Sequence, residues 1–322
     1  MRLFKHLLTA ALLLMAGAQH AIAQSYPDRA VKMVVPFPAG STVDALARFV
    51  ADELRKALGQ PVVIENLAGA DGILAAQAVK RAAPDGYTIM MSTNSPHAAN
   101  PALYVQLPYD PEKDFEPVST LMRVPQMLVV RKDFPANDMA GFVRVAKERA
   151  AKSLNYGTGN TTSQVLGALL KVDAKIEMTA VPYRGMPQVL QDLLGGQIDL
   201  TFTDRNLAAP LIDAGLIKAL AVTDTVRMPT LPQVPTMGEV GHKSVELAAW
   251  AGVFAPAKTD PVIIERLNRE LNRIIVTPQG REAVAKMGAT PITMTPGEFR
   301  AFLALEITRW GRFVEMAGIA KK

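Results

Sequence analysis

The sequence predicts an α/β protein of two lobes, each built on a mainly parallel sheet flanked by helices. Three observations predict this fold class. Short β-branched runs alternate with amphipathic helical segments, as expected for parallel sheets. Glycine-bearing turns lie between strands and the helices that follow them. The chain has 322 residues, which is long enough for two sizeable cores.

The first 23 residues have the three-part pattern of an export signal. Arg2 and Lys5 give a short positive start, and the apolar run 7–17 is too short to span a bilayer. Residues 21–23 (AIA) match a cleavage site, so the mature protein is expected to begin near Gln24. A buried N-terminal helix is the alternative, but the run lacks a polar face. We therefore expect an exported, periplasmic protein.

Composition excludes several function classes. The chain has no cysteine, so it has no disulfide, no thiol nucleophile and no lipid-anchored cysteine. No later run reaches the roughly 18 apolar residues of a membrane span. Loss of Arg2 and Lys5 on cleavage lowers the net charge from +5 to +3. Aromatic residues make up 6% and are not interleaved with basic residues, which argues against nucleic-acid binding.

The first third of the chain alternates strands and helices. Val31–Val35 has the pattern of a buried strand. Apolar residues from Thr42 onward recur at helical spacing, and Gly59 ends that helix. Asp71 is the expected N-cap of a further helix. The other elements expected here are strands at 61–65 and 87–91 and the helix at 73–82.

The middle of the chain repeats this scheme. Asp138 is the expected N-cap of a helix that runs to about residue 151. The small and polar loop 157–163 leads from a short strand into a helix with an apolar face. Residues 184–187 precede another helix. The strands expected in this part are 127–131, 154–156, 178–183, 198–203 and 218–223.

The last part has a different character. The proline-rich segment 228–235 is typical of a surface connection, and 250–254 has the pattern of a strand. Asp260 followed by proline predicts a helix start. Residues 295–298 (TPGE) have the capping-box form and predict the start of the final long helix.

The candidate ligand site lies in the loops that lead from strands into helices, because ligands of open α/β sheets bind there. The turn 39–41 opens directly into a helix and aims unpaired N–H groups at one point, which suits an anion. The segment 35–40 (VPFPAG) is echoed by 181–185 (VPYRG), which would place an aromatic ring on each wall of a cleft. The candidate ligand-binding residues are Phe37, Gly40, Ser41, Thr42, Asn94, Gly159, Asn160, Thr161, Thr162, Ser163, Tyr183, Asp204 and Arg205.

The turn at 39–42 also has a structural interpretation. Ser41 and Thr42, followed by Asp44, are residues that cap a helix and suit its dipole. For Asp44 capping is the preferred role, because a carboxylate in an anion pocket would repel the ligand. For Gly40, Ser41 and Thr42, capping and ligand contact are compatible.

The other candidates also have structural alternatives. The loop 159–163 would serve as an ordinary N-cap, although its run of small and polar residues favours a cradle of hydrogen-bond donors. Phe37 and Tyr183 would both suit a core, and Tyr183 is the better cleft candidate because of its hydroxyl. Arg205 fits a surface position as well as a binding site.

Little in the sequence indicates catalysis or a cofactor. His97 and His242 are the only histidines beyond the export signal, and they form no metal-ligand spacing. The chain lacks G-x-S-x-G and P-loop motifs. We expect no metal, no cofactor and no catalytic residue.

Many short motifs in a fixed order make the chain resemble a known family, the tripartite tricarboxylate transporter substrate-binding proteins, or Bug-type receptors. The resemblance covers essentially the whole mature chain, and its specificity comes from the order of the motifs. They are 34–40 (VVPFPAG), 59–66 (GQPVVIEN), 84–87 (PDGY), 100–104 (NPALY), 107–110 (LPYD), 114–118 (DFEPV), 181–183 (VPY), 192–197 (DLLGGQ), 220–223 (LAVT), 231–236 (LPQVPT) and 255–257 (APA).

The resemblance implies a two-lobed periplasmic-binding-protein fold of type II, with two crossover strands and the ligand cleft between the lobes. We expect lobe 1 at 24–124 and 245–322, and lobe 2 at 125–244. In that family the loop matching 37–42 holds a ligand carboxylate, and the loop matching 159–163 wraps another polar group. The loop after 198–203 helps to select the ligand.

The chain departs from the family pattern in ways that bear on the ligand. Ser41 follows Gly40 where a double glycine is common, Asp71 stands in a glycine motif, and Gln164 replaces a common histidine. In the specificity loop, Arg205 would fork onto a second ligand carboxylate, and Asp204 would pair with Arg205 or meet a ligand amine. Mono-, di- and tricarboxylates, amino acids and aromatic acids therefore all remain open.

The leading hypothesis is a monomeric, non-enzymatic receptor that binds a small organic carboxylate and delivers it to the membrane permease subunits of a tripartite tricarboxylate transporter. Lobe closure would create the surface that the permease recognises. One alternative is an exported hydrolase with Ser41 or Ser163 as nucleophile. Another is a sensor that presents its ligand to a signalling kinase.

Overall fold

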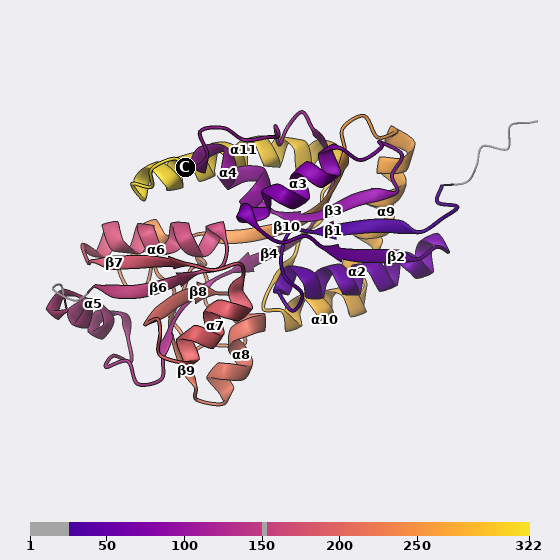
Figure 1. Cartoon of the computed structure of the whole chain (residues 1–322). Helices are drawn as coiled ribbons and strands as arrows, with labels where there is room; N and C mark the ends of the chain where they lie inside the picture. Colours follow the sequence, from indigo (N-terminus) through magenta and orange to yellow (C-terminus); the bar gives the residue numbers. More distant parts are fainter. Residues whose placement is uncertain (1–25, 150–152) are drawn as a thin grey trace, which may run out of the picture.

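The computed structural model describes residues 26–149 and 153–322, so the expected export signal lies outside the described residues. The described residues form two lobes, each with one mixed sheet and helices on both faces (Figure 1). The strands are β1 (Val31–Val35), β2 (Val62–Asn66), β3 (Thr88–Thr93), β4 (Phe115–Pro125), β5 (Met127–Arg131), β6 (Leu154–Thr158), β7 (Met178–Pro182), β8 (Leu200–Thr203), β9 (Ile217–Val222), β10 (Ala248–Pro256) and β11 (Thr290–Pro291).

The helices follow most of the strands. They are α2 (Thr42–Leu58), η1 (Ala70–Gly72), α3 (Ile73–Lys80), η2 (Ser95–Ala99), α4 (Asn100–Leu103), α5 (Met139–Glu148), α6 (Thr161–Ala174), α7 (Met186–Leu194), α8 (Arg205–Asp213), η3 (Lys243–Val245), α9 (Pro261–Val276), α10 (Pro278–Lys286) and α11 (Pro296–Met316). Among the helices of the described ranges, none is both long and apolar enough to cross a membrane.

Each sheet combines a parallel part with an antiparallel part. The first sheet has the order β11-β4-β10-β3-β1-β2, and β1 pairs in parallel with β2 and β3. The second has the order β7-β6-β8-β5-β9, and β6 pairs in parallel with β7 and β8. The pairs of β10 with β3 and β4, and of β5 with β8 and β9, are antiparallel. The sheets are therefore mixed, and their parallel parts are the strand–helix–strand units that the sequence predicts.

Alternating side chains of the strands fill cores on both faces of each sheet. In β1, Val31, Met33 and Val35 pack with α2 and α9, whereas Val34 belongs to the core on the opposite face. In the second sheet, Met127 and Val129 pack toward α7, while Leu128 and Val130 face the core that includes α5 and α6. Burial on both faces explains why these strands are continuous apolar runs.

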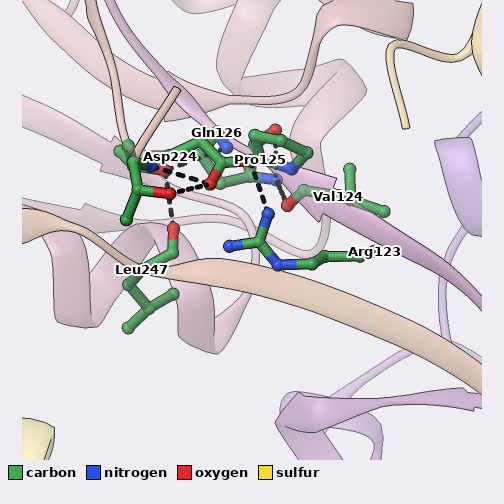
Figure 2. A network of polar contacts seen from close by, with 8 residues as sticks. Arg123, Val124, Pro125, Gln126, Asp224 and Leu247 are labelled. Carbon is green, nitrogen blue, oxygen red and sulfur yellow. Dashed lines mark hydrogen bonds and ion pairs between the residues drawn. The ribbon is translucent and has the colours of Figure 1, made fainter. Parts of the chain in front are cut away.

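The chain passes between the two sheets at Gln126 and again between β9 and β10. Figure 2 shows the polar network at this crossing. The Thr223 hydroxyl donates to the carbonyl of Leu247 at 2.6 Å and accepts from the Gln126 N–H at 3.0 Å. Arg123 pairs with Asp224, with 2.5 Å between Nη1 and Oδ2. These contacts join the two segments that connect the lobes. The exact lobe boundaries near residues 124 and 244 remain a prediction.

Two local expectations need correction. Asp71 is not the N-cap of α3: Gly72 occupies that position, and no side chain caps it. Asp71 has a left-handed φ of 52°, accepts from the Tyr104 hydroxyl and pairs with Lys322.

The strand pattern in the sequence also missed β4, whose polar residues Ser119 and Thr120 are fully buried. Both strand neighbours of β4 lie more than 120 residues later in the sequence, so local alternation gives little sign of it.

Candidate functional site

A cavity of about 60 Å³ lies between the two lobes. Its walls are the first residues of α2, α6, α7 and α8, together with the end of β3 and parts of β4 and β10. Eight sequence-predicted site residues line it: Phe37, Ser41, Thr42, Asn94, Gly159, Asn160, Thr162 and Asp204. The structure thus brings together loops from both halves of the chain.

The start of α2 forms one wall of the cavity. Ser41 is the N-cap, and its Oγ accepts from the Asp44 N–H at 3.2 Å. The first residues of a helix have no intrahelical acceptor for their N–H groups. Within the described residues, the N–H groups of Thr42 and Val43 make no hydrogen bond, and both residues line the cavity. This wall therefore offers main-chain donors at the positive end of a helix dipole.

Asp44 has the structural role that the sequence favours. Its Oδ2 accepts from the Gly40 N–H and from Arg48 Nε, both at 3.0 Å, and its Oδ1 accepts from Asn66 at 2.9 Å. Burial alone would raise the pKa of Asp44, but the hydrogen bonds from Arg48, Asn66 and Gly40 lower it below its ordinary value. Gly40 is exposed, is absent from the cavity wall and donates its N–H to Asp44, so the structure does not place it as a ligand donor.

The loop before α6 forms the facing wall as a capping box. Asn160 Oδ1 accepts from the Ser163 N–H at 2.8 Å, and the Ser163 hydroxyl accepts from the N–H groups of Gly159 and Asn160. Those three amides are consequently used within the loop. Thr161 and Thr162 provide the first two N–H groups of α6, and these make no hydrogen bond in the described part of the chain. Only part of this predicted cradle therefore has donors to offer.

Two buried hydrogen bonds cross the cavity from lobe to lobe. The Thr42 hydroxyl donates to Asp204 Oδ1 at 2.7 Å, and Asn94 Nδ2 donates to the Thr162 hydroxyl at 2.9 Å. Asn94 Oδ1 in turn accepts from the Trp250 N–H at 3.3 Å. Each bond pairs a residue of the first sheet's lobe with one from the second, so the lobes are held together around the cavity.

Among the described residues that line the cavity, Asp204 is the only charged one. It is the N-cap of α8, and its Oδ1 also accepts from the Leu207 N–H at 3.3 Å. Burial raises the pKa of Asp204, although hydrogen bonds from Thr42 and from main-chain N–H groups oppose this. Within residues 26–149 and 153–322, no lysine, arginine or histidine lines the cavity.

Four further predicted residues lie away from the cavity. Arg205 points to α10, where its Nη1 donates to the Lys286 carbonyl at 3.4 Å. The Tyr183 hydroxyl donates to Asp192 at 2.6 Å within its own lobe. Ser163 is fully buried behind the loop that it caps. Tyr183 and Thr161 line a neighbouring groove of about 360 Å³.

Sequence reasoning missed an apolar part of the cavity. Met122, Val124 and Trp250 line it from the long antiparallel strands, and Met186 and Leu207 do so from the starts of α7 and α8. Of these residues, only Met186 belongs to a glycine-bearing turn, at 184–187 (RGMP). Trp250 lies in a predicted strand, and its indole is in the core, where it donates to Glu306. Its main chain reaches the site because β10 pairs with β3, and this pairing is not visible in the local sequence.

The geometry provides no catalytic constellation for the two serines that the hydrolase alternative requires. Ser41 and Ser163 both cap helices, and neither hydrogen-bonds to a histidine in the described residues. The ring of His97 stacks on Phe254, and burial lowers the pKa of His97 to about 3. Across residues 26–149 and 153–322, no group of three metal-ligating side chains is found.

Comparison with known proteins gives consistent matches. The family model described as tripartite tricarboxylate transporter family receptor matches residues 46–319. Protein BugT from Bordetella pertussis is 34% identical over 302 residues, which cover 93% of each chain.

Solved structures match along nearly the whole chain. Rpa4515 of R. palustris with adipate has a TM-score of 0.89 at 36% identity, covering 92% of this chain and 100% of that one. MatC from Rhodopseudomonas palustris with bound malate has a TM-score of 0.84 at 35% identity, covering 90% and 100%. The periplasmic binding protein BugD has a TM-score of 0.87 at 33% identity, covering 92% and 100%. The two-lobed arrangement is thus that of periplasmic binding proteins.

Proposed function

This chain belongs to the tripartite tricarboxylate transporter receptor family, and we propose that it binds a small organic carboxylate between its lobes and delivers it to the permease subunits of such a transporter. The observation that carries the proposal is the interlobe cavity at the starts of α2 and α6. Unpaired N–H groups at a helix start favour an anion. The similar structures that hold adipate and malate support the same class of ligand.

A binding role without catalysis agrees with the chemistry of the cavity. The donors at α2 and α6 are main-chain N–H groups and hydroxyls, which bind an anion without transforming it. Two lobes that close on a ligand would also convert its presence into a surface that a permease recognises. Residues 1–23 would direct the protein to the periplasm and be removed there, with no lipid anchor.

A thermal-shift screen of the purified protein over organic acids tests ligand binding. A compound that binds only the folded state raises the melting temperature, and we expect small carboxylates to do so. The compound recovered after binding should be chemically unaltered, whereas its conversion would favour the hydrolase alternative. Loss of uptake of that acid in a strain without the protein, restored by the intact gene, would support delivery to a permease. Unchanged uptake would favour a sensory role.

A further inference from the structure

In the part of the chain that the structure describes, the interlobe cavity is lined by one carboxylate and by no basic side chain. Asp204 is 8% exposed, and the rest of the cavity wall is made of hydroxyls, amides, main-chain groups and apolar side chains. A ligand with two or three carboxylates would bring additional negative charge next to this group, and no lining cation would offset the repulsion. The wall is therefore poorly matched to a dianion.

The structural roles of Asp204 use only one of its two oxygens. Oδ1 caps α8 through the Leu207 N–H and accepts from the Thr42 hydroxyl. The main-chain N–H of Asn206 also lies near the carboxylate, but among the described residues no hydrogen bond of normal distance and angle reaches Oδ2, and no ion pair joins Asp204 to Arg205. Asparagine or serine would cap the helix equally well, so the cap alone does not require a carboxylate.

We infer that the ligand is a zwitterionic α-amino acid with an apolar side chain, whose ammonium group pairs with Asp204. The inference rests on the proposed function, because it assigns the ligand carboxylate to the free N–H groups at the starts of α2 and α6. Thr42 is the first residue of one of these helices, and its hydroxyl lies 2.7 Å from Asp204 Oδ1. In an α-amino acid the carboxylate and the ammonium group are attached to neighbouring carbon atoms. The carboxylate can therefore bind the helix-start N–H groups while the ammonium group pairs with the carboxylate of Asp204. Met122, Val124, Met186 and Leu207 would contact an apolar side chain.

The test compares ligands that differ in one group each. Leucine is paired with 4-methylpentanoate, which lacks the amine, and with 3-methylbutylamine, which lacks the carboxylate. Phenylalanine is paired likewise with 3-phenylpropanoate and 2-phenylethylamine, and adipate and malate represent dicarboxylates. Binding to the intact mature protein is measured by titration calorimetry. We expect at least one of the two amino acids to bind about tenfold or more tighter than its partner without the amine and than either dicarboxylate.

The variant Asp204→Asn keeps an N-cap and the acceptor for Thr42 while it removes the charge. It should reduce affinity for the amino acid about tenfold or more and leave or improve affinity for the acid without the amine. Asp213→Asn, at the exposed far end of the same helix, is the matched control and should change neither value.

The outcomes separate this inference from the proposed function. Tighter binding of adipate, malate or the acids without an amine by the wild-type protein would overturn the inference and keep the carboxylate receptor. An unchanged preference in Asp204→Asn would also overturn it. Equal binding of an amine without a carboxylate would instead count against the proposed function. If no compound of the panel binds, both fail. The wild-type comparison stands even if the variant does not fold.

Discussion

Thr42 and Asp204 join the two lobes through a buried hydrogen bond in which the Thr42 hydroxyl donates to Oδ1 of Asp204 at 2.7 Å. Thr42 is the first residue of α2, and Asp204 is the N-cap of α8. Asn206 Nδ2 donates to the same Thr42 oxygen at 3.2 Å. Thr42 therefore contacts the opposite lobe and also lines the cavity. Closure of the lobes and ligand binding thus depend on the same residue.

Replacing Thr42 with valine should weaken ligand binding. Thr42→Val keeps the shape of the side chain but leaves Asp204 without its partner across the interface. A buried group that loses its hydrogen bond costs about 1–3 kcal/mol, so ligand affinity should fall by about 5- to 150-fold. Titration calorimetry with the best carboxylate of the screen measures this. Thr308→Val, at an exposed hydroxyl of α11, is the control, and equal affinities for the two variants would refute the role of Thr42.

Thr223 should be important for the stability of the crossing between the lobes. Its hydroxyl both donates to the Leu247 carbonyl and accepts from the Gln126 N–H, and the side chain is 1% exposed. Thr223→Val leaves both main-chain groups unpaired and should lower the free energy of unfolding by about 1–3 kcal/mol. Chemical denaturation measures the change. Thr223→Ser retains the hydroxyl and should recover most of the loss; a serine variant as unstable as the valine variant would contradict this account.

Asp44 should make part of the stability depend on pH. Its pKa is lowered in the folded protein, so its ionised form stabilises the fold above the unfolded pKa of about 3.9. That contribution is lost as pH falls through the lower, folded pKa. Asp44→Asn should therefore be less stable than wild type near neutral pH, and the difference should narrow below about pH 4.

The check is a series of denaturation curves between neutral and acid pH. Asp52→Asn, on the exposed face of the same helix, is the matched control and should follow the wild-type curve. A difference between Asp44→Asn and wild type that stays constant down to acid pH would show that the carboxylate charge does not stabilise the fold.

The helices with capping residues could be predicted from the sequence because their signals are local. Ser41, Asp138 and Thr295 each accept the N–H bond that their position predicts. The polar part of the cavity could be predicted for a related reason, because loops between parallel strands and helices gather at one edge of a sheet. What a local pattern could not predict is β4, since its sheet partners are distant in sequence.

The individual roles of neighbouring residues also depend on the folded geometry. Asp204 and Arg205 are adjacent in sequence, yet Asp204 lines the cavity whereas Arg205 contacts the Lys286 carbonyl of the other lobe. The two positions are the N-cap and the first residue of α8, and these side chains leave the helix in different directions. The role of Gly40 could not be predicted from the sequence either, because its N–H donates to Asp44 and not into the cavity.

Gly185 should determine how closely the lobes approach each other. A Cβ atom at this position would lie 2.6 Å from Cγ of Pro38, which belongs to the opposite lobe and lines the cavity. The backbone of Gly185 is extended, with φ of −178°, so alanine is not strained there. Gly185→Ala should therefore hinder closure without harming either lobe. We expect ligand affinity to fall about tenfold, because overpacking of a tight contact costs about 1–3 kcal/mol.

The result that distinguishes this explanation is a loss of ligand affinity in Gly185→Ala without a loss of stability. The free energy of unfolding of Gly185→Ala without ligand should stay the same or rise slightly, since alanine reduces the freedom of the unfolded chain. Small-angle scattering with saturating ligand should give a larger radius of gyration than for wild type. Gly311→Ala, where a Cβ meets no atom within 4 Å, is the control and should bind normally. Normal affinity of Gly185→Ala would mean that the ligand-bound lobes do not bring Gly185 against Pro38.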